Sequence, residues 1–453
     1  MKKISQFKDK QVLVLGLAKS GTAAAELLLK LGANVTVNDR NPLKENPDAQ
    51  RLQELGAEVI CGSHPIELIH AQLDYVVKNP GIRYDNSLVE KAISLEIPVI
   101  TEVELAFLIS EADIIGITGS NGKTTTTTYI YEMMKGSKRE PFIAGNIGKV
   151  ACEVAQKVTE KNVMVTELSS FQLMGIEKFE PKIALLLNIV EAHIDYHGSL
   201  NEYMTAKAKI FKNQTEMDYL IYNADDVGVS ELVTSGQAKS KLIPFSTTNP
   251  VNWGGCVKDG WLEVFGESLI PLEDMSLPGE HNVANGLAAA CAAILSGAKK
   301  EQVIEVLKSF RGVEHRLQFV ASHEGRKFYN NSKATNVPAT ITALKAFEQP
   351  VILLAGGLDR GLSFDGLLPY LKGVKSVITY GETAEKIAAT AREAGIDNIH
   401  VRPSLDLAVP TAFEQSEQGD VILLSPACAS WDQFKTFEER GNHFVQAVKK
   451  IVQ

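Results

Sequence analysis

The segment Thr118–Thr125, with the sequence TGSNGKTT, constrains the fold of this chain more than any other feature. It follows the apolar run Asp113–Ile117 and precedes a stretch with helical character. A strand that leads through a glycine-rich turn into a helix presents several backbone N–H groups to an anion, and the helix dipole adds to their effect. The sequence therefore predicts an α/β domain that holds a phosphate group at this turn.

The side chains of this turn fit a nucleoside triphosphate and its metal ion. Lys123 would neutralise the terminal phosphates, and the Thr124 hydroxyl would ligate Mg²⁺. The spacing departs from the strict phosphate-loop motif, because Ile117 stands where that motif has its first glycine. The alternative interpretation is a polar loop without a ligand. We expect a bound triphosphate to contact Gly119, Ser120, Asn121, Gly122, Lys123, Thr124 and Thr125.

Composition indicates a globular protein with more than one domain. At 453 residues the chain exceeds what one hydrophobic core usually organises. Its 45% hydrophobic and 22% charged residues are ordinary for a soluble protein, and its net charge of -9 disfavours binding to a polyanion. We therefore expect two or three domains and no nucleic acid partner.

The sequence predicts neither secretion nor a membrane span. No apolar core follows the lysines of the N-terminus, and no apolar stretch approaches the length needed to cross a bilayer. The five cysteines are scattered and show neither disulfide nor zinc spacing. We expect a cytoplasmic protein, because thiols stay reduced in that compartment.

The first hundred residues alternate strand-like and helical patterns. Gln11–Leu15 and Ala33–Val37 are typical of strands, and Gly21–Lys30, rich in Ala and Leu, predicts a helix between them. Such alternation is typical of a parallel sheet. The sequence therefore predicts an N-terminal Rossmann-like domain at residues 1–109.

A dinucleotide-type fingerprint, Gly16–Gly21, connects the first strand to its helix. Ala18 replaces the second glycine, and its methyl group obstructs the approach of the backbone to a pyrophosphate, which disfavours a nicotinamide cofactor. Asp39 lies 18 residues beyond Gly21, about where an acid would meet a ribose hydroxyl. A nucleotide diphosphate fits this turn, and the alternative is a turn needed only for packing.

Two further α/β units follow. Val163–Glu167 and Ile183–Asn188 are apolar runs with polar ends, as buried parallel strands are when they deliver side chains to a site. A third unit begins near Gly312, with strands expected at Phe328–Asn330, Val351–Ala355, Ser376–Tyr380 and Val421–Ser425. We predict a central P-loop ATPase domain with a mostly parallel sheet at residues 110–312 and a C-terminal Rossmann-like domain at residues 313–453.

Polar residues near the central strands indicate a metal site. Glu167 closes a strand about 45 residues after Lys123, where a triphosphate enzyme places a carboxylate on its metal. The alternative is an acid that faces solvent. His193 and His197 are spaced as zinc ligands can be, yet no third soft ligand is near, so Mg²⁺ fits better. Ala206–Lys209 by itself is typical of a solvated helix face.

The chain also carries motifs in the order found in the Mur ligases, the ATP-dependent amide ligases of peptidoglycan precursor synthesis. The motifs are Thr118–Thr125, Ala144–Gly148, Glu167–Ser170, Asn188–His193, Leu277–Asn282, His315–Arg316 and Asn331–Asn336. This resemblance covers essentially the whole chain. Within the family, Ser332–Asn336 and Ser425–Phe434 resemble the branch that adds D-glutamate.

The resemblance implies an amide-forming reaction. ATP would phosphorylate the C-terminal carboxylate of UDP-N-acetylmuramoyl-L-alanine, and the amine of D-glutamate would attack the acyl phosphate. The tetrahedral intermediate would then expel phosphate. Because two anions meet in the first step, the site needs concentrated positive charge and metal. We expect the enzyme to act as a monomer on these three small-molecule substrates.

The resemblance also implies the ligands of two Mg²⁺ ions. Thr124 and Glu167 would hold the first ion, and His193 would ligate a second that bridges ATP and the substrate carboxylate. Lys207 matches the family lysine that CO₂ carbamylates, a change that turns a cation into an oxygen ligand. Lys209 is the competing residue in register. The expected catalytic residues are Lys123, Glu167, His193 and Lys207.

The same resemblance implies the nucleotide contacts. Asn282 and Asn285 would lie near adenine, and Arg316 and Asn331 would contact ATP from the third domain. Asn331 stands where the family commonly has Asp, and its carbonyl oxygen can still accept a hydrogen bond from ribose. The UDP-sugar would contact Gly16, Ala18, Lys19, Asp39, Arg40, Asn79, Gly81, Asn146 and His193.

The C-terminal motifs imply an amino-acid site. D-Glutamate would contact Lys333, Thr335, Arg360, Ser430 and Phe437. Arg360 stands where the family often has lysine, and a guanidinium can still pair with a carboxylate. Cys428 lies in the same region without an evident base, and we interpret it as a buried, inert thiol.

Three alternatives stay open at this point. Another Mur-family member or a folylpolyglutamate-type ligase would add a different amino acid, although Asn331–Asn336 differs from their signatures. A regulatory ATPase would hydrolyse ATP without an amine. A dehydrogenase would use the Gly16–Gly21 turn, which lacks the middle glycine of its motif.

Overall fold

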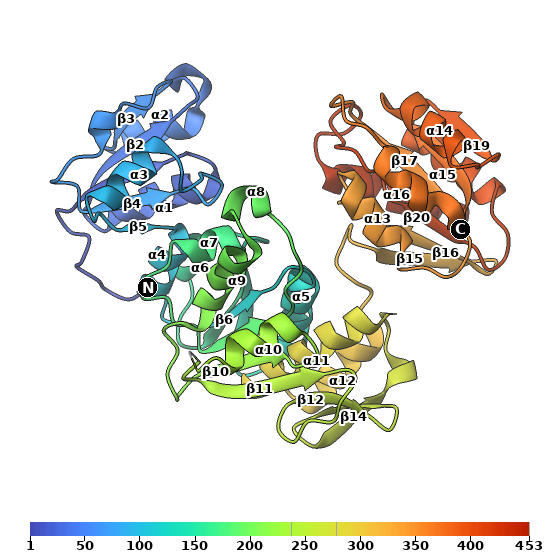
Figure 1. Ribbon diagram of the computed structural model, residues 1–453, viewed down its shortest axis with the longest axis horizontal. Helices are drawn as coiled ribbons and strands as arrows, with labels where there is room; N and C mark the ends of the chain where they lie inside the picture. Colours follow the sequence, from blue (N-terminus) through green and yellow to red (C-terminus); the bar gives the residue numbers. More distant parts are fainter. Residues whose placement is uncertain (237, 278, 453) are drawn as a thin grey trace. The chain divides into compact units, whose positions relative to one another are not determined.

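The computed structural model describes residues 1–236, 238–277 and 279–452. Within this described part the chain forms two compact units, Met1–Ser309 and Phe310–Gln453 (Figure 1). The first unit contains two β-sheets and the second contains one. The predicted α/β fold, with an N-terminal, a central and a C-terminal sheet, is confirmed.

The first sheet has the strand order β3-β2-β1-β4-β5, and all its neighbouring strands are parallel. This order is that of a Rossmann-like half, as predicted. The central strand β1 is apolar because both of its faces are covered, and its Val12 and Leu15 are at most 2% exposed. The elements are β1 (Gln11–Leu15), α1 (Lys19–Lys30), β2 (Asn34–Asp39), α2 (Pro47–Glu54), β3 (Glu58–Cys61), β4 (Tyr75–Lys78), α3 (Ser87–Ser94) and β5 (Val99–Ile100).

The central sheet has the order β14-β13-β12-β11-β10-β9-β6-β8-β7. Its strands are parallel from β7 to β12, and β13 and β14 add an antiparallel edge. The strands are β6 (Asp113–Thr118), β7 (Glu140–Gly145), β8 (Asn162–Glu167), β9 (Ile183–Leu186), β10 (Tyr219–Asn223), β11 (Lys241–Ser246), β12 (Gly255–Lys258), β13 (Trp261–Val264) and β14 (Glu267–Pro271). The strands predicted before the phosphate loop, before Glu167 and before Asn188 are confirmed.

Helices from distant parts of the chain cover this sheet. The long α11 packs against α5, the helix that follows the phosphate loop. The helices are α4 (Glu102–Ile109), α5 (Lys123–Met134), α6 (Ala151–Ala155), α7 (Ser170–Met174), α8 (Ile194–His197), α9 (Leu200–Ala208), α10 (Val227–Thr234), α11 (Glu280–Leu295) and α12 (Lys300–Ser309). The site therefore receives residues from several segments.

The two sheets of the first unit share a hydrophobic core. Helix α4 packs against both α1 and α6. Val37 of the first sheet, Val103 of α4 and Val154 of α6 belong to one buried cluster. The core is therefore continuous across residue 109, and the domain boundaries after residues 109 and 312 stay predictions.

The second unit contains one sheet with the order β15-β16-β20-β17-β18-β19. Only the β15–β16 pair of this sheet is antiparallel among the described strands. The elements are β15 (Gln318–His323), β16 (Arg326–Asn330), α13 (Val337–Leu344), β17 (Val351–Gly356), β18 (Val374–Tyr380), α14 (Ala384–Glu393), β19 (Ile399–Arg402), α15 (Leu405–Glu414), β20 (Val421–Leu424) and α16 (Phe437–Val452). All four strands predicted here are confirmed.

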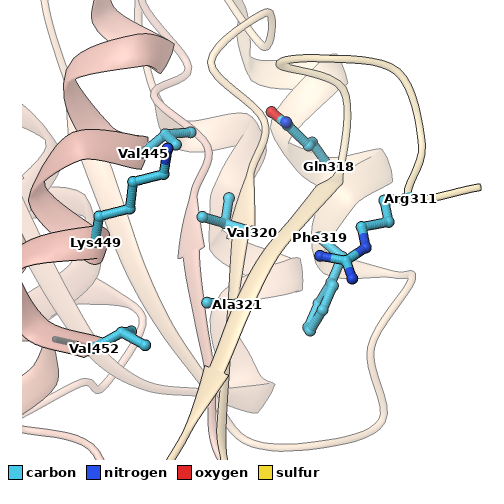
Figure 2. A pocket seen from close by; sticks show the side chains of 8 residues that line it. All are labelled: Arg311, Gln318, Phe319, Val320, Ala321, Val445, Lys449 and Val452. Atoms are coloured by element: carbon cyan, nitrogen blue, oxygen red, sulfur yellow. The ribbon is translucent and has the colours of Figure 1, made fainter.

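A cavity of about 280 Å³ lies between β15 and α16 of this unit (Figure 2). Val320 and Val445 contribute apolar lining, and Arg311 and Lys449 bring positive charge. None of the site residues predicted from the sequence lines it. Among the described helices, none is both long and apolar enough to span a membrane.

Candidate active site

The phosphate loop joins β6 to α5, as the sequence predicts. Gly122 caps α5 in the left-handed region with φ of 80°, and a Cβ there would lie 2.2 Å from Oδ1 of Asn285. A Cβ on Gly119 would lie 2.9 Å from that of Leu187. The Lys123 ammonium donates to the carbonyls of Gly119 and Ser120, both at 2.8 Å. Both glycines of the loop are therefore required by close packing.

Asn188, just beyond β9, holds the loop in shape. Its Oδ1 accepts from the Asn121 N–H at 2.8 Å, and its Nδ2 donates to the Asn121 carbonyl at 3.1 Å. Its own carbonyl accepts from the Ser120 N–H at 2.9 Å. The Ser120 hydroxyl lies 3.0 Å from the hydroxyl of Tyr203. The loop is thus preorganised by neighbours on the next strand and on α9.

Glu167 lies at the carboxyl end of β8 and is 1% exposed. One carboxylate oxygen accepts from the Thr124 hydroxyl and the other from the Asn146 amide, each at 2.7 Å. The alternative of a solvent-facing acid is therefore wrong. A carboxylate and a hydroxyl beside the phosphate loop are the oxygen ligands that Mg²⁺ prefers.

The donor set for a metal ion is small. Among the described residues, no group of three or more His, Cys, Asp and Glu side chains is arranged to hold an ion. Thr124 and Glu167 would therefore leave several positions of an octahedral Mg²⁺ for phosphate oxygens and water. This pattern is typical of nucleotide-bound Mg²⁺ rather than of an all-protein cage.

Lys207 lies inside the protein, with 1% of its side chain exposed. Its ammonium donates to the Gly119 carbonyl at 2.8 Å and lies 4.6 Å from the ring centre of Tyr203. Burial, and to a lesser extent repulsion from Lys123, lowers its pKa to about 6. Lys209 instead donates to the Met174 carbonyl at 2.6 Å. The solvated-face interpretation is wrong for Lys207, which alone of the two lysines contacts the phosphate loop.

The two histidines of this region have different surroundings. His193 adopts a left-handed backbone with φ of 57° before α8, and its ring packs edge-on against Phe171 at 5.0 Å. His197 is 4% exposed, lies 2.9 Å from the Ser170 hydroxyl through Nε2 and stacks on Phe171. Burial lowers the pKa of His197 to about 4. His197 is thus a neutral packing residue, and the pair does not form a zinc site among the described residues.

Asn285 connects α11 to the helix after the phosphate loop. It is 6% exposed, and its Oδ1 accepts from the Thr126 hydroxyl at 3.3 Å. Asn282, one turn earlier on α11, is half-buried. The two residues predicted to lie near adenine are therefore on the helix that packs against the loop, with Asn285 directly behind Gly122.

Of the nine predicted UDP-sugar residues, seven gather at the carboxyl ends of β1, β2 and β4, whereas Asn146 follows β7 and His193 precedes α8. Asp39 accepts from the Leu17 N–H at 2.7 Å and from the Asn41 N–H at 2.9 Å. Its carboxylate therefore shapes the turn after β1. Asn79 donates to the Ser20 hydroxyl at 3.1 Å and accepts from the N–H of Gly81. The other members at this edge are Gly16, whose backbone adopts φ of 83°, and the exposed Ala18, Lys19 and Arg40.

Lys78, at the end of β4, is 1% exposed and joins this edge to α8. Its ammonium donates to the Ile82 carbonyl at 2.8 Å and to the hydroxyl of Tyr196 at 3.2 Å. The Tyr196 hydroxyl in turn donates to the Ile82 carbonyl at 2.8 Å. Burial lowers the pKa of Lys78 to about 7. We call Lys78 and Tyr196 the interdomain latch.

In the second unit, two of the residues predicted to bind D-glutamate place their positive charge over an aromatic ring. The Lys333 ammonium lies 4.7 Å from the ring centre of Phe437, and Arg360 lies 4.7 Å from that of Trp431. Ser430 is 1% exposed, and its hydroxyl has no hydrogen-bond partner among the described residues. Thr335 is half-buried beside Lys333.

Two residues of the second unit, Arg316 and Asn331, were predicted to contact ATP. Arg316 lies just before β15, and Asn331 lies just after β16. Asn331 accepts from the Leu317 N–H at 3.2 Å and donates to the Ser425 hydroxyl at 3.1 Å. It therefore fixes the turn that carries Arg316. Cys428 is 4% exposed, and burial raises the pKa of its thiol, which agrees with an inert cysteine.

Three family models match consecutive parts of the chain. The Mur ligase MurD-like N-terminal domain matches residues 10–101, the Mur ligase middle domain residues 117–293, and the Mur ligase glutamate ligase domain residues 315–428. The chain belongs to the Mur ligase family. The matched segments contain the phosphate loop, Glu167 and Lys333.

Known Mur ligases resemble this chain along its whole length. A Bacillus cereus protein named UDP-N-acetylmuramoylalanine--D-glutamate ligase is 57% identical over 452 residues, and the match covers 100% of both chains. A Bacillus anthracis protein of the same name is 56% identical at the same coverage.

Solved Mur ligase structures share the fold. MurC from Thermotoga maritima has a TM-score of 0.57 at 18% identity, covering 97% of this chain and 99% of its own. MurF from Thermotoga maritima in complex with ADP has a TM-score of 0.56 at 16% identity, covering 99% and 98%. At these identities the likeness concerns the fold alone.

Sequence reasoning missed several residues of this Mur ligase site. Asn188 was recognised as the polar end of a predicted strand and as part of a family motif, but no role was assigned to it. Tyr203, Lys78 and Tyr196 had no signal in the sequence, because their contacts join segments that are far apart along the chain.

Proposed function

We propose that this Mur ligase joins D-glutamate to UDP-N-acetylmuramoyl-L-alanine at the expense of ATP, through an acyl phosphate. The observation that carries the proposal is the Thr124–Glu167–Asn146 hydrogen-bonded set beside the phosphate loop. It combines a triphosphate site with oxygen ligands for metal. The names of relatives that are 56–57% identical over the full chain support the choice of substrates.

The phosphate loop would handle ATP. Backbone N–H groups at the start of α5 would bind the phosphates of ATP. The Lys123 ammonium would give up its hydrogen bonds to the loop carbonyls and contact the β- and γ-phosphates instead. Thr124 and Glu167 would hold Mg²⁺, which supplies Lewis acidity when bound. Asn282 and Asn285 would border adenine, with Arg316 and Asn331 contributing from the second unit.

A second Mg²⁺ held by His193 and a carbamate on Lys207 is part of the proposal. The Lys207 nitrogen would attack CO₂ and release a proton, which leaves an anionic carbamate. Its support is geometric, because the Lys207 nitrogen is buried and 2.8 Å from the Gly119 carbonyl of the phosphate loop. The carbamate oxygens could ligate a cation, whereas the ammonium of an unmodified lysine cannot.

The remaining residues would position the two organic substrates. The edge that contains Gly16, Asp39 and Asn79, with Ala18, Lys19, Arg40, Gly81, Asn146 and His193, would bind the UDP-sugar. Lys333, Thr335, Arg360, Ser430 and Phe437 would bind D-glutamate. We further propose that the enzyme is cytoplasmic, acts as a monomer and has domain boundaries after residues 109 and 312.

One assay tests this function. Phosphate release from ATP and Mg²⁺ should require both UDP-N-acetylmuramoyl-L-alanine and D-glutamate. With ¹⁸O in the alanine carboxylate, the released phosphate should carry one ¹⁸O atom, because the acyl phosphate transfers that oxygen when the amine displaces phosphate. Release without an amine would favour the regulatory ATPase, and equal rates with L-glutamate or L-lysine would refute the choice of amino acid. Unlabelled phosphate would refute the acyl phosphate.

A further inference from the structure

The second unit buries an arginine that forms no ion pair among the described residues. Arg440, in the first turn of α16, is 0% exposed and heads the fully buried side chains in volume. Among the described residues, Asp432 attracts the guanidinium electrostatically without a recorded ion pair, and Nη1 has no hydrogen-bond partner of acceptable geometry. A buried charge is expensive unless it is paired. Its retention therefore needs an explanation.

The other guanidinium nitrogens join two loops to the helix. Nε donates to the Ser332 hydroxyl at 3.0 Å, and Nη2 donates to the carbonyls of Ser332 at 2.8 Å and Cys428 at 3.0 Å. The Ser332 hydroxyl donates to the Phe437 carbonyl at 2.8 Å, which closes the network. One planar fork thus fixes three segments in a single geometry.

These three segments carry the residues proposed for D-glutamate. Lys333 follows Ser332 directly, Ser430 lies two residues after Cys428, and Phe437 begins the helix that contains Arg440. None of the proposed D-glutamate contacts includes Arg440 itself. The fork donates to Ser332 and Cys428, which precede Lys333 and Ser430 in the sequence, and the Ser332 hydroxyl connects it to the Phe437 carbonyl.

The surroundings of the unpaired nitrogen contain further unsatisfied polar atoms. The hydroxyls of Ser430 and Tyr380, each 1% exposed, have no hydrogen-bond partner of acceptable geometry among the described residues. A Cβ on Gly357 would lie 3.2 Å from Nη1 of Arg440 and 2.3 Å from the Ala429 carbonyl, so the chain passes very close here. These atoms lie at or just after the carboxyl ends of β17, β18 and β20, where α/β sheets bind ligands.

We propose that Arg440 is a positioning residue for the amino-acid substrate. Its fork holds the Lys333, Ser430 and Phe437 segments in register, and its buried positive charge favours the carboxylates of D-glutamate. It acts through these segments and does not contact the substrate, because it has no exposed surface. This inference rests on the proposed function.

The test compares variants that separate charge from geometry. Arg440→Lys keeps the charge and loses the fork, whereas Arg440→Met loses both. Ser332→Ala removes one acceptor of the fork and leaves the arginine in place. Arg326→Met is the matched control, because Arg326 donates in the same manner to the Ser416 hydroxyl at 3.0 Å and carbonyl at 3.1 Å, on another part of the unit.

Steady-state kinetics of each folded variant should give separate KM values for the three substrates. We expect the KM of D-glutamate to rise at least tenfold in Arg440→Met, less in Arg440→Lys and about threefold in Ser332→Ala. The KM values of ATP and the UDP-sugar should stay within twofold. Arg326→Met should lose thermal stability with no change in the KM of D-glutamate.

Three results would overturn the inference. They are equal rises for all substrates, an unchanged KM for D-glutamate in a folded Arg440 variant, and the same D-glutamate effect in Arg326→Met. If Arg440→Met does not fold, Arg440→Lys and Ser332→Ala decide the question by the same criteria. Failure of the proposed function is distinguishable, because the unmodified enzyme would then show no turnover that depends on D-glutamate.

Discussion

Replacing Gly122 by alanine would test whether the phosphate loop and α11 are packed as tightly as their distances indicate. The new Cβ would lie 2.2 Å from Oδ1 of Asn285, and the residue would have to keep a φ of 80°. Asn285 would have to move away and give up its hydrogen bond from Thr126. Gly136 provides the control, because it also has a positive φ, of 73°, but open space around its Cβ position.

The two substitutions should differ by the contribution of the clash. Placing alanine in the left-handed region costs about 1–2 kcal/mol at either position. Breaking the buried Asn285–Thr126 hydrogen bond adds about 1–3 kcal/mol at Gly122 alone. We therefore expect a loss of about 1–2 kcal/mol for Gly136→Ala and about 2–5 kcal/mol for Gly122→Ala in the free energy of unfolding.

Urea titrations of both variants would measure these losses, and the KM for ATP would report on the loop. Gly122→Ala should raise this KM about 5- to 30-fold, which corresponds to about 1–2 kcal/mol of lost binding. Gly136→Ala should leave it unchanged. Equal destabilisation by the two substitutions, or an unchanged KM in Gly122→Ala, would refute the reasoning.

Two further predictions concern buried ionisable groups. Burial raises the pKa of Glu102 from 4.5 to about 7, so between these pH values the folded protein holds a proton that the unfolded chain has released. The free energy of unfolding should therefore fall by about 3 kcal/mol as pH rises through this window, and urea titrations of Glu102→Gln should lack that fall; an identical pH dependence would contradict the assignment. Lys207→Ala should abolish ligase activity and regain part of it with formate or acetate, whereas Lys209→Ala should stay active. In the unmodified enzyme ¹³C-bicarbonate should give a carbamate NMR signal that Lys207→Ala lacks, and full activity of Lys207→Ala would exclude the carbamate.

Local patterns predicted the parts of the fold where one segment determines its own structure. The strand before the phosphate loop, the loop glycines and α5 follow from hydrophobic pattern and from the needs of a tight turn. Thr124 was expected near the metal from the phosphate-loop motif, and Glu167 from its place at the end of a strand after that loop. Their hydrogen bond of 2.7 Å agrees with that reasoning.

Other elements depend on contacts that no local pattern contains. The strands β10 to β14 are short and partly exposed, and none of them was predicted from the sequence. The local pattern of Ala206–Lys209 is typical of a solvated helix face, and the site role of Lys207 came from the family resemblance alone; in the fold its ammonium contacts the phosphate loop. Arg440 had no signal at all, since its partners are up to 108 residues away in the sequence.

The interdomain latch has a thermodynamic consequence. Tyr196 is three residues from His193 along the chain. Both Tyr196 and Lys78 donate hydrogen bonds to backbone carbonyls of the turn that follows Asn79. If that turn binds the sugar nucleotide and His193 binds metal, each ligand stabilises the same arrangement of latch and turn. Linkage then requires the two affinities to change each other by the same factor. Under these conditions, the Mg²⁺ concentration would change the affinity of the enzyme for its sugar nucleotide before any phosphoryl group is transferred.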